Sequence, residues 1–423
     1  MKRAAIAVVL SVASSVLYGA PAGVRFAQSS DSVDCYDFVD VVANVEKPDA
    51  ANPFTDVVVE GEFSAADGQA IHVDGFCDSA DGRTFRIRFM PTTPGDYEYS
   101  VTYRQGDYRS SHKGKFVARK GGRRGLIRVD EDHPWHFLWE GTGEHFFWNG
   151  TTTYWLLGWD DETICGNIDR LSRLQVNRLR VAINGRVKDG RAWFENVFPA
   201  EKFSFLMNPW VAQRPDSVED PGFDVTRFNL PHWQKIERML RHAREKDMAI
   251  SIIFYVDGAR PGVDPFGKAR MGGQDEQRYY RYAAARLAAF SNVMWDVTNE
   301  YHLFRNEEWT DKMGVFLKQC DPYDHVTSVH GHGQFPFRTS EWADFAMYQS
   351  WDEAGGYRFM LNNRIEQQKA GRPMPQINEE YGYEDHYPAA WGGGLKAPAR
   401  SADNRRRLAW GMYMAGGYQT TGE

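Results

Sequence analysis

Two apolar segments of this chain end on carboxylates that could take part in acid–base chemistry. One reads NVMWDVTNE and ends on Asn299 and Glu300, and the other reads MPQINEE and ends on Glu379 and Glu380. A protonated carboxyl group opposite an ionised one can break a glycosidic bond: one assists the departing oxygen, while the other attacks the anomeric carbon or activates water. This chemistry depends on whether the fold brings the two segments together.

The elements that must position these carboxylates are indicated by a change of periodicity after the first third of the chain. Short apolar runs alternate there with longer amphipathic segments, as in a parallel sheet with helical crossovers. The runs predict eight strands, at residues 146–152, 177–184, 248–257, 293–300, 325–333, 345–351, 374–380 and 418–423. The amphipathic segments predict helices at residues 233–246, 275–288, 307–318 and 402–414. This α/β pattern over residues 127–423 predicts a (β/α)8 TIM barrel.

The predicted barrel has one incomplete end, because no helix follows its last strand. We expect either a truncated chain or a neighbouring element that closes the barrel. The alternative fold is a doubly wound open sheet, which is disfavoured because no G-x-G-x-x-G motif follows the first strand.

A TIM barrel carries its chemistry at the C-terminal ends of its strands, where both acidic segments lie. Side chains alternate between the two faces of a strand. In the fourth strand the apolar Val293, Trp295 and Val297 are predicted to face the helices. This alternation places Asp296 and Glu300 inside the barrel.

The same alternation in the seventh strand places Gln376, Asn378 and Glu380 inside. We therefore predict Glu380, rather than Glu379, as the second carboxylate, unless a bulge shifts the alternation. At a separation of about 5 to 5.5 Å the second carboxylate acts as nucleophile and the configuration is retained. The alternative is that Glu300 and Glu380 cap the segments after them or form surface ion pairs.

Two arginines of the second strand are predicted to face the same interior. Arg178 and Arg180 alternate with apolar residues, and a buried guanidinium needs a partner, for which Asp296 is one candidate. Asn299 could bind the 2-hydroxyl of a sugar, a contact that strengthens in the transition state.

A histidine pair ends the fifth strand. His330 and His332 are two positions apart and share one face, so we predict that they line a sugar pocket. The alternative is a metal-dependent barrel hydrolase that uses both histidines with Asp257. No cofactor is predicted.

A long aromatic segment over residues 185–230 follows the second strand. We predict that it walls one side of a substrate cleft and that Trp193 and Trp210 offer stacking faces to sugars. Trp351, at the end of the sixth strand, is predicted to do the same. The alternative is that these aromatic side chains pack within the protein.

The first part of the chain has the pattern of an all-β domain. Short alternating runs at residues 57–59, 71–73, 85–89 and 97–101 are separated by turn residues. They predict a β-sandwich over residues 30–119. The basic, glycine-rich residues 120–126 are predicted to be a linker.

Four segments resemble a known family. FRIRFMP at residues 85–91 and GDYEY at 95–99 are similar to the immunoglobulin-like domain that precedes the barrel in a group of bacterial glycoside hydrolases. FWNGTTTYW at 147–155 and EYGYE at 380–384 resemble the apiosidase-like branch of the clan A retaining enzymes. The resemblance covers roughly residues 34–423 and departs from the family in the missing last helix and C-terminal sandwich.

The resemblance also implies roles for individual residues. It implies Glu300 as acid/base, Glu380 as nucleophile and Asn299 as a substrate-binding residue. It further implies that Arg180 lies beside the nucleophile and holds it ionised, and that Tyr348 on the sixth strand orients it. A non-catalytic carbohydrate-binding protein on the same fold is the alternative.

The N-terminus predicts export. Lys2 and Arg3 precede an apolar run, and Ala20-Pro21-Ala22 fits a signal-peptidase site, so residues 1–22 are predicted to be a signal peptide of a secreted or periplasmic protein. An N-terminal membrane anchor is the alternative, and no later run is long enough to span a membrane.

The charged residues of the chain narrow the kinds of molecule that we expect it to bind. Lys and Arg number 50 against 57 Asp and Glu, a net charge of -7, and no long basic run supports a nucleic-acid partner. A carbohydrate is the expected partner, and the oligomeric state is open. Of the four cysteines, Cys35 and Cys77 are the candidate disulfide pair.

Overall fold

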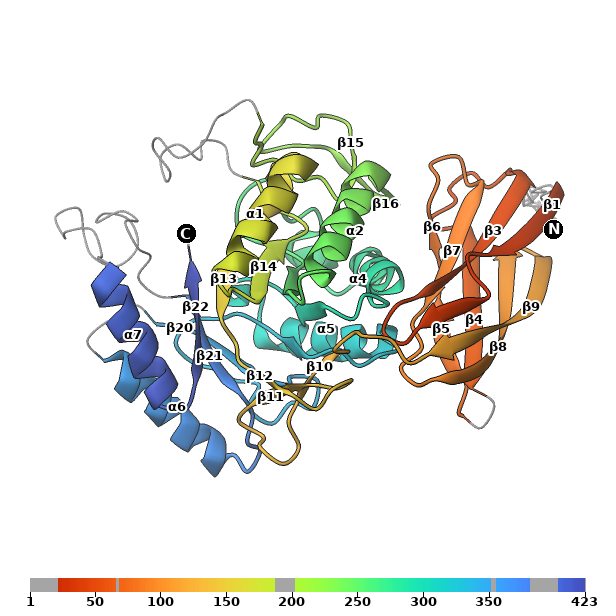
Figure 1. The fold of residues 1–423 in the computed structure, drawn as a ribbon. Helices are drawn as coiled ribbons and strands as arrows, with labels where there is room; N and C mark the ends of the chain where they lie inside the picture. Colours follow the sequence, from red (N-terminus) through yellow and green to blue (C-terminus); the bar gives the residue numbers. More distant parts are fainter. Residues whose placement is uncertain (1–21, 66–67, 187–201, 351–354, 381–401, 423) are drawn as a thin grey trace, which may run out of the picture.

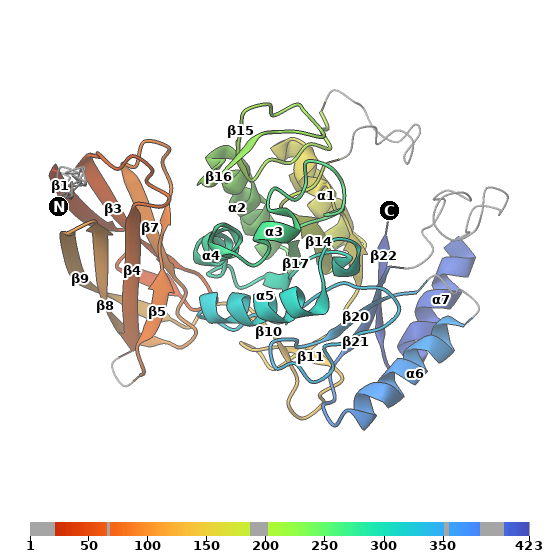
Figure 2. The same cartoon turned by 180° about the vertical axis from the view of Figure 1, so that it is seen from behind.

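The computed structural model describes residues 22–65, 68–186, 202–350, 355–380 and 402–422. A β-sandwich and a barrel-like parallel sheet surrounded by helices lie side by side (Figures 1 and 2). The predicted combination of an all-β domain and a (β/α) barrel is confirmed.

The β-sandwich consists of two sheets with strand orders β1-β3-β7-β6 and β2-β9-β8-β4-β5. Alternating side chains from both sheets fill its core, and Phe63, Ile87 and Val101 are fully buried. The domain includes β1, which pairs with β3 and lies ahead of the expected boundary at residue 30. The strands are β1 (Ala22–Gln28), β2 (Ser32–Asp34), β3 (Val39–Lys47), β4 (Val57–Ala65), β5 (Ile71–Asp74), β6 (Phe76–Cys77), β7 (Thr84–Phe89), β8 (Gly95–Gln105) and β9 (Tyr108–Arg119).

The predicted disulfide between Cys35 and Cys77 is wrong. Both cysteines are buried, free thiols. Cys35 follows β2 in one sheet, whereas Cys77 ends β6 in the other. The thiol of Cys77 donates instead to the carbonyl oxygen of Ser79, at 3.1 Å.

The second domain contains eight parallel strands in the order β19-β18-β17-β14-β13-β22-β21-β20. The strands are β13 (Gly150–Thr152), β14 (Arg178–Ala182), β17 (Ala249–Ile253), β18 (Val293–Asp296), β19 (Thr327–Ser328), β20 (Ala346–Gln349), β21 (Gln376–Glu380) and β22 (Tyr418–Gly422). Each lies within one of the eight predicted runs. The order follows the chain from strand one, β13, to strand eight, β22, which returns to β13 and pairs with it.

Helices cover the outside of this sheet (Figure 1). All four predicted helices are present, and α1, α3 and α6 were not predicted. The helices are η1 (Leu156–Gly158), α1 (Asp161–Arg173), α2 (Leu230–Arg244), α3 (Gly267–Arg270), α4 (Gln274–Leu287), η3 (Tyr301–Leu303), α5 (Glu307–Cys320), α6 (Gly356–Lys369) and α7 (Ala402–Met414).

The seam of the barrel lies between β19 and β20, the two ends of the strand order. Single hydrogen bonds join them there: Asp344 N–H donates to the carbonyl of Thr327 at 2.9 Å, and the hydroxyl of Ser328 donates to the carbonyl of Phe345 at 2.5 Å. The sheet is therefore barrel-like, with hydrogen bonds bridging its seam.

A small antiparallel sheet covers the N-terminal end of the barrel. It consists of β10 (Ile127–Val129), β11 (Phe137–Trp139) and β12 (His145–Phe146). Its aromatic side chains form one cluster with Met294 and Ile377 from the barrel strands. This closure leaves the opposite, C-terminal end for a site. A two-stranded hairpin, β15 (Trp210–Ala212) and β16 (Phe223–Phe228), follows β14.

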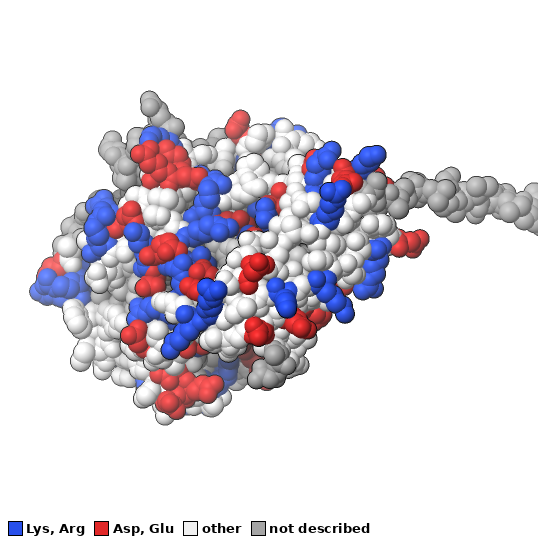
Figure 3. All heavy atoms as spheres, turned by 45° about the vertical axis from the view of Figure 1, so that its right-hand side comes forward, with Lys and Arg blue, Asp and Glu red and all other residues white. Residues whose placement is uncertain are grey.

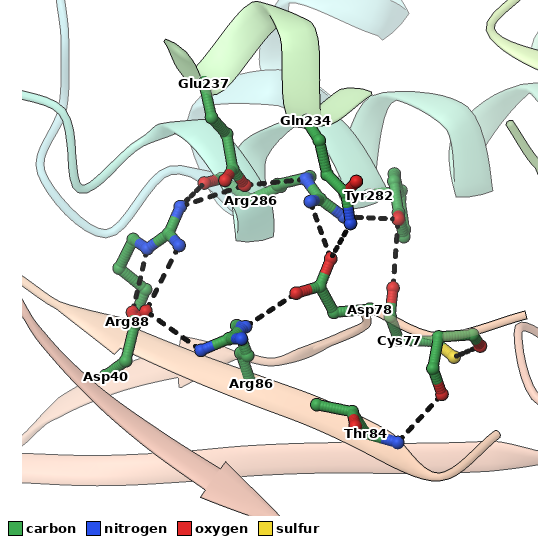
Figure 4. A network of polar contacts seen from close by, with 11 residues as sticks. Asp40, Cys77, Asp78, Thr84, Arg86, Arg88, Gln234, Glu237, Tyr282 and Arg286 are labelled. Atoms are coloured by element: carbon green, nitrogen blue, oxygen red, sulfur yellow. Dashed lines mark hydrogen bonds and ion pairs between the residues drawn. The ribbon is translucent and has the colours of Figure 1, made fainter. Parts of the chain in front are cut away.

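Buried ion pairs join the two domains (Figure 4). Arg88 on β7 pairs with Asp40 on β3 at 2.8 Å and with Glu237 on α2 at 3.1 Å. Arg286 on α4 pairs with the same Glu237 and with Asp78 beyond β6, both at 2.7 Å. The sandwich is therefore fixed against α2 and α4 by alternating charges.

Ion pairs hold the predicted linker to both domains. Arg123 pairs with Asp37 of the sandwich at 3.5 Å and with Glu245 of the barrel domain at 2.6 Å. On the face shown in Figure 3, Lys and Arg alternate with Asp and Glu and form no single basic area. Within the described part of the chain, no helix combines the length and apolar character needed to cross a membrane.

Candidate active site

Glu300 lies just beyond β18, at the C-terminal end of the barrel. Its backbone is left-handed, with φ 44° and ψ 52°, and η3 begins directly after it. A residue other than glycine adopts this conformation at a cost, and such residues concentrate at functional sites. The predicted alternation of this strand holds: Asp296 faces the interior and pairs with Arg180 at 2.6 Å, while Trp295 donates to Asp321 beyond α5 at 2.9 Å.

The alternation predicted for the seventh strand is wrong. Gln376 reaches outward and donates to the carbonyl of Asn363 on α6, whereas Ile377 packs in the barrel interior. The pairing between β20 and β21 then shifts register after Tyr348. This irregularity lets two consecutive residues, Glu379 and Glu380, both face the interior.

The two adjacent glutamates have different environments. Glu379 is fully buried and pairs with Arg178 at 2.8 Å. Glu380 lies at the mouth and accepts a hydrogen bond from the hydroxyl of Tyr154 at 3.0 Å. Glu379 is therefore part of a buried ion pair, whereas Glu380, which is 8% exposed, meets Tyr154 at the mouth.

A chain of hydrogen bonds links Glu380 to Glu300. The hydroxyl of Tyr154 lies 3.0 Å from Glu380 and 3.2 Å from Oδ1 of Asn299, and Nδ2 of Asn299 donates to Glu300 at 3.2 Å. Arg180 donates to Asn299 and to Tyr154, both at 3.0 Å. The side chains at the ends of β13, β14, β18 and β21 thus form one polar network.

The electrostatics of this network favour a neutral Glu300. Burial, followed by the negative charges of Glu380 and Asp257, raises the pKa of Glu300 to about 7. A hydrogen bond from Gln349 acts in the opposite direction. Glu300 can therefore hold a proton near neutral pH, as a general acid must.

The two predicted histidines lie at the same mouth. His330 is buried with Nε2 3.8 Å from the carboxylate of Glu380, and neither ring nitrogen has a hydrogen-bond partner among the described residues. Burial, and next the charge of Arg180, keeps the pKa of His330 far below its usual range, so its ring is neutral. His332 is exposed and, with Tyr301 and His302, lines a cleft of about 480 Å³.

Two predicted site residues face elsewhere. The hydroxyl of Tyr348 accepts from Arg338 at 3.1 Å and its ring packs on Phe359 of α6, so Tyr348 lies outside the barrel mouth. Tyr348 immediately precedes Gln349, whose side chain reaches Glu300, so the simple alternation of β20 turns Tyr348 outward. Trp210 is fully buried against Tyr279, so it offers no stacking face. Packing within the protein was the correct alternative for Trp210.

Trp193 and Trp351 lie outside the described residues, as do residues 1–21 of the predicted signal peptide. Two residues at the site were missed as candidates, Tyr154 and Gln349. Tyr154 belongs to the FWNGTTTYW segment, whose aromatic and polar residues were the available signal.

The metal alternative has little support in the geometry. Among the residues that the structure describes, no three His, Cys, Asp or Glu side chains gather closely enough to hold a metal ion. Asp257, its proposed third ligand, pairs with Arg260 at 2.8 Å.

Comparisons with known proteins match two families to this chain. A family described as "Apiosidase-like, catalytic domain" matches residues 133–421, and a domain of unknown function, DUF5060, matches residues 32–104. A search of curated protein sequences finds no match.

Solved structures share the fold. A crystal structure from Bacteroides vulgatus ATCC 8482, provisionally described as a glycoside hydrolase, has a TM-score of 0.75 and 23% identity over 93% of this chain and 72% of that one. A glycoside hydrolase family 5 structure from the same strain has a TM-score of 0.50 and 16% identity over 71% of this chain and 62% of that one. Because the catalytic-domain match spans most of the sequence, this chain belongs to the apiosidase-like family of glycoside hydrolases.

Proposed function

We propose that this glycosidase cleaves its substrate by double displacement, with retention of anomeric configuration. The observation that carries the proposal is the network at the barrel mouth, in which Tyr154 and Asn299 connect an ionisable Glu380 to a Glu300 whose pKa is raised to about 7. One carboxyl group is thereby suited to donate a proton and the other to attack.

In the first step a carboxylate oxygen of Glu380 attacks C1 of the sugar. The bond between C1 and the leaving oxygen breaks, and that oxygen takes the proton of Glu300. In the second step water attacks C1 and gives a proton to Glu300, while the ester bond to Glu380 breaks. Asn299 and the neutral His330 are placed to bind sugar hydroxyls during both steps.

The proposed substrate is a plant or algal poly- or oligosaccharide, encountered outside the cytoplasm. Support comes from the family match and from the N-terminal sequence, whose basic, apolar and small residues fit a signal peptide.

The test is hydrolysis of a panel of plant and algal polysaccharides, with NMR detection of the anomer released first. Wild-type protein should release the retained anomer. Glu300→Gln and Glu380→Gln should each lose at least about a thousandfold in kcat/KM. Glu60→Gln, on the sandwich, is the matched control and should keep full activity.

Release of the inverted anomer would remove Glu380 as nucleophile. Binding of a polysaccharide by wild type and Glu300→Gln alike, with no turnover by either, would favour a carbohydrate-binding protein. Loss of hydrolysis after exhaustive chelation would favour a metal-dependent reaction.

A further inference from the structure

The hydroxyl of Tyr154 is the point at which the polar network of the mouth branches. It lies within 3.2 Å of three groups: Arg180 at 3.0 Å, Glu380 at 3.0 Å and Oδ1 of Asn299 at 3.2 Å. Its ring packs against that of Trp155 and lies below the guanidinium of Arg180. Tyr154 therefore contacts the predicted nucleophile and the residue beside the predicted acid.

The protons that each side chain carries determine which atom donates in each of these hydrogen bonds. A guanidinium has only donors, so Arg180 donates to the oxygen of Tyr154, and the atom of Asn299 that faces Arg180 must be Oδ1. The amide group of Asn299, Nδ2, then points to Glu300. The phenol of Tyr154 has one proton to donate. Two acceptors lie within reach of it, the carboxylate of Glu380 and Oδ1 of Asn299.

In the free enzyme the phenol donates this hydrogen bond to Glu380. A carboxylate is the stronger acceptor and is the nearer of the two, and Oδ1 of Asn299 is already supplied by Arg180. Burial and the charge of Glu380 raise the pKa of Tyr154 well above its ordinary value, so the phenol keeps its proton.

The relative strength of these two acceptors changes when Glu380 becomes an ester. Forming the bond to C1 removes its negative charge, and a neutral ester is a poorer acceptor than an ionised carboxylate. Oδ1 of Asn299 is the other acceptor within reach, and a bond to it helps to hold Nδ2 toward Glu300.

We propose that Tyr154 is a positioning residue whose one donated hydrogen bond passes from Glu380 to Asn299 when the glycosyl-enzyme forms and returns when it is hydrolysed. The proposal rests on the double displacement proposed above. Tyr154 keeps its proton throughout, and the proton transfers of the reaction remain those between Glu300, the leaving oxygen and water. The phenol stabilises Glu380 as the departing carboxylate of the second step.

Tyr154→Phe removes only this hydroxyl, and with it the hydrogen bond donated to Glu380 and the one accepted from Arg180. Hydrolysis of the intermediate should slow about ten- to hundredfold. Because the intermediate then accumulates, KM should fall together with kcat. The acidic limb of the pH profile should move to higher pH, because the ionised form of Glu380 has lost a donor.

Tyr348→Phe is the matched control. Tyr348 is also a buried tyrosine whose hydroxyl accepts from an arginine, but that arginine, Arg338, lies outside the mouth. A merely structural loss of a buried hydroxyl should affect both variants alike, whereas a positioning role should affect only Tyr154→Phe.

Two measurements test the proposal. The first follows the release of dinitrophenolate from a panel of 2,4-dinitrophenyl glycosides, and it should show a burst and then a slow steady rate for Tyr154→Phe alone. The second, which needs no turnover, titrates the glutamate carboxyl carbons by NMR, and the signal that Glu380→Gln removes should titrate at higher pH in Tyr154→Phe.

An unchanged titration of Glu380 in Tyr154→Phe would overturn the proposal, and so would an equal shift in Tyr348→Phe. Failure of the double displacement itself looks different: wild-type protein would then release the inverted anomer or hydrolyse no glycoside, or Glu380→Gln would remain active.

Discussion

At the residue scale, the most informative contrast is between two adjacent glutamates. Glu379 and Glu380 follow each other in the chain, yet the first pairs with a buried arginine and the second meets a tyrosine hydroxyl at the mouth. Substitution of Glu379 should therefore mainly lower stability, whereas substitution of Glu380 should mainly lower activity.

Glu379→Gln should lower the free energy of unfolding by about 3–5 kcal/mol, because it leaves the guanidinium of Arg178 buried without its counter-charge. Glu380→Gln should cost far less stability. Thermal and denaturant unfolding of the two variants measure this difference. Equal destabilisation by both substitutions would refute the separate roles.

Glu300 gives a prediction about pH. Its pKa is raised to about 7, so its acid form is present below that pH and lost above it, and kcat/KM should fall as the pH rises through this value. The hydrogen bond from Gln349 favours the ionised form. Gln349→Ala should therefore raise the pKa of Glu300 and move the alkaline limb to higher pH.

The pH dependence of kcat/KM measures this shift. Gln376→Ala is the control, because Gln376 is a buried glutamine on the neighbouring strand that bonds α6 outside the barrel. An alkaline limb that stays in place or moves to lower pH in Gln349→Ala would show that Glu300 is not the acid.

At the scale of elements, sequence periodicity located all eight barrel strands but failed on one alternation. Strand β18 follows its simple alternation, so Asp296 and Trp295 face as predicted. Strand β21 does not, because the register between β20 and β21 shifts after Tyr348, and pairing between strands is not written in the alternation of either one. The family resemblance implied Tyr348, which lies outside the mouth, whereas its missed neighbour Gln349 bonds Glu300.

Helix α6 was missed because only Gly356, Met360, Asn363 and Gln367 are buried in it, which gives the sequence little apolar periodicity. The role of Tyr154 could not be read either, because its partners come from strands four and seven, far apart in the chain.

The segment between β19 and β20 gives a prediction at this scale. It has no helix among its described residues and packs Trp342 onto Gly314 of α5, where an added Cβ would lie 2.2 Å from the indole ring. Gly314→Ala should destabilise the protein by about 1–3 kcal/mol in spite of the higher helix propensity of alanine. Gly166 of α1 has nothing within 4 Å of such a Cβ, so Gly166→Ala should stabilise by about 0.5–1 kcal/mol.

Thermal unfolding of both variants measures the pair of effects. A stabilised Gly314→Ala would show that Trp342 moves aside at little cost and that its packing does not stabilise α5.

At the scale of the whole molecule, a buried set of charged side chains joins the sandwich to the barrel, in addition to the linker. Arg88 and Arg286 together meet Asp40, Asp78 and Glu237 across the interface (Figure 4). Composition and periodicity separate the two domains but carry no sign of this set, since its members are distant in sequence.

Arg88→Met should lower the free energy of unfolding by about 3–5 kcal/mol, because two buried carboxylates lose a partner. Arg104→Met is the matched control, since Arg104 pairs with Glu60 on the exposed face of the sandwich and should cost at most about 1 kcal/mol. Denaturant unfolding compares them. Similar losses for both would mean that the interface charges contribute no more than a surface pair.

The central claim is that Glu380 forms a covalent bond to the sugar while Glu300 serves as the acid. It is tested most directly by trapping the intermediate with a 2-deoxy-2-fluoroglycoside bearing a good leaving group and mapping the labelled peptide by mass spectrometry. One sugar should be attached to Glu380. A label on Glu379 or on any other residue would contradict it.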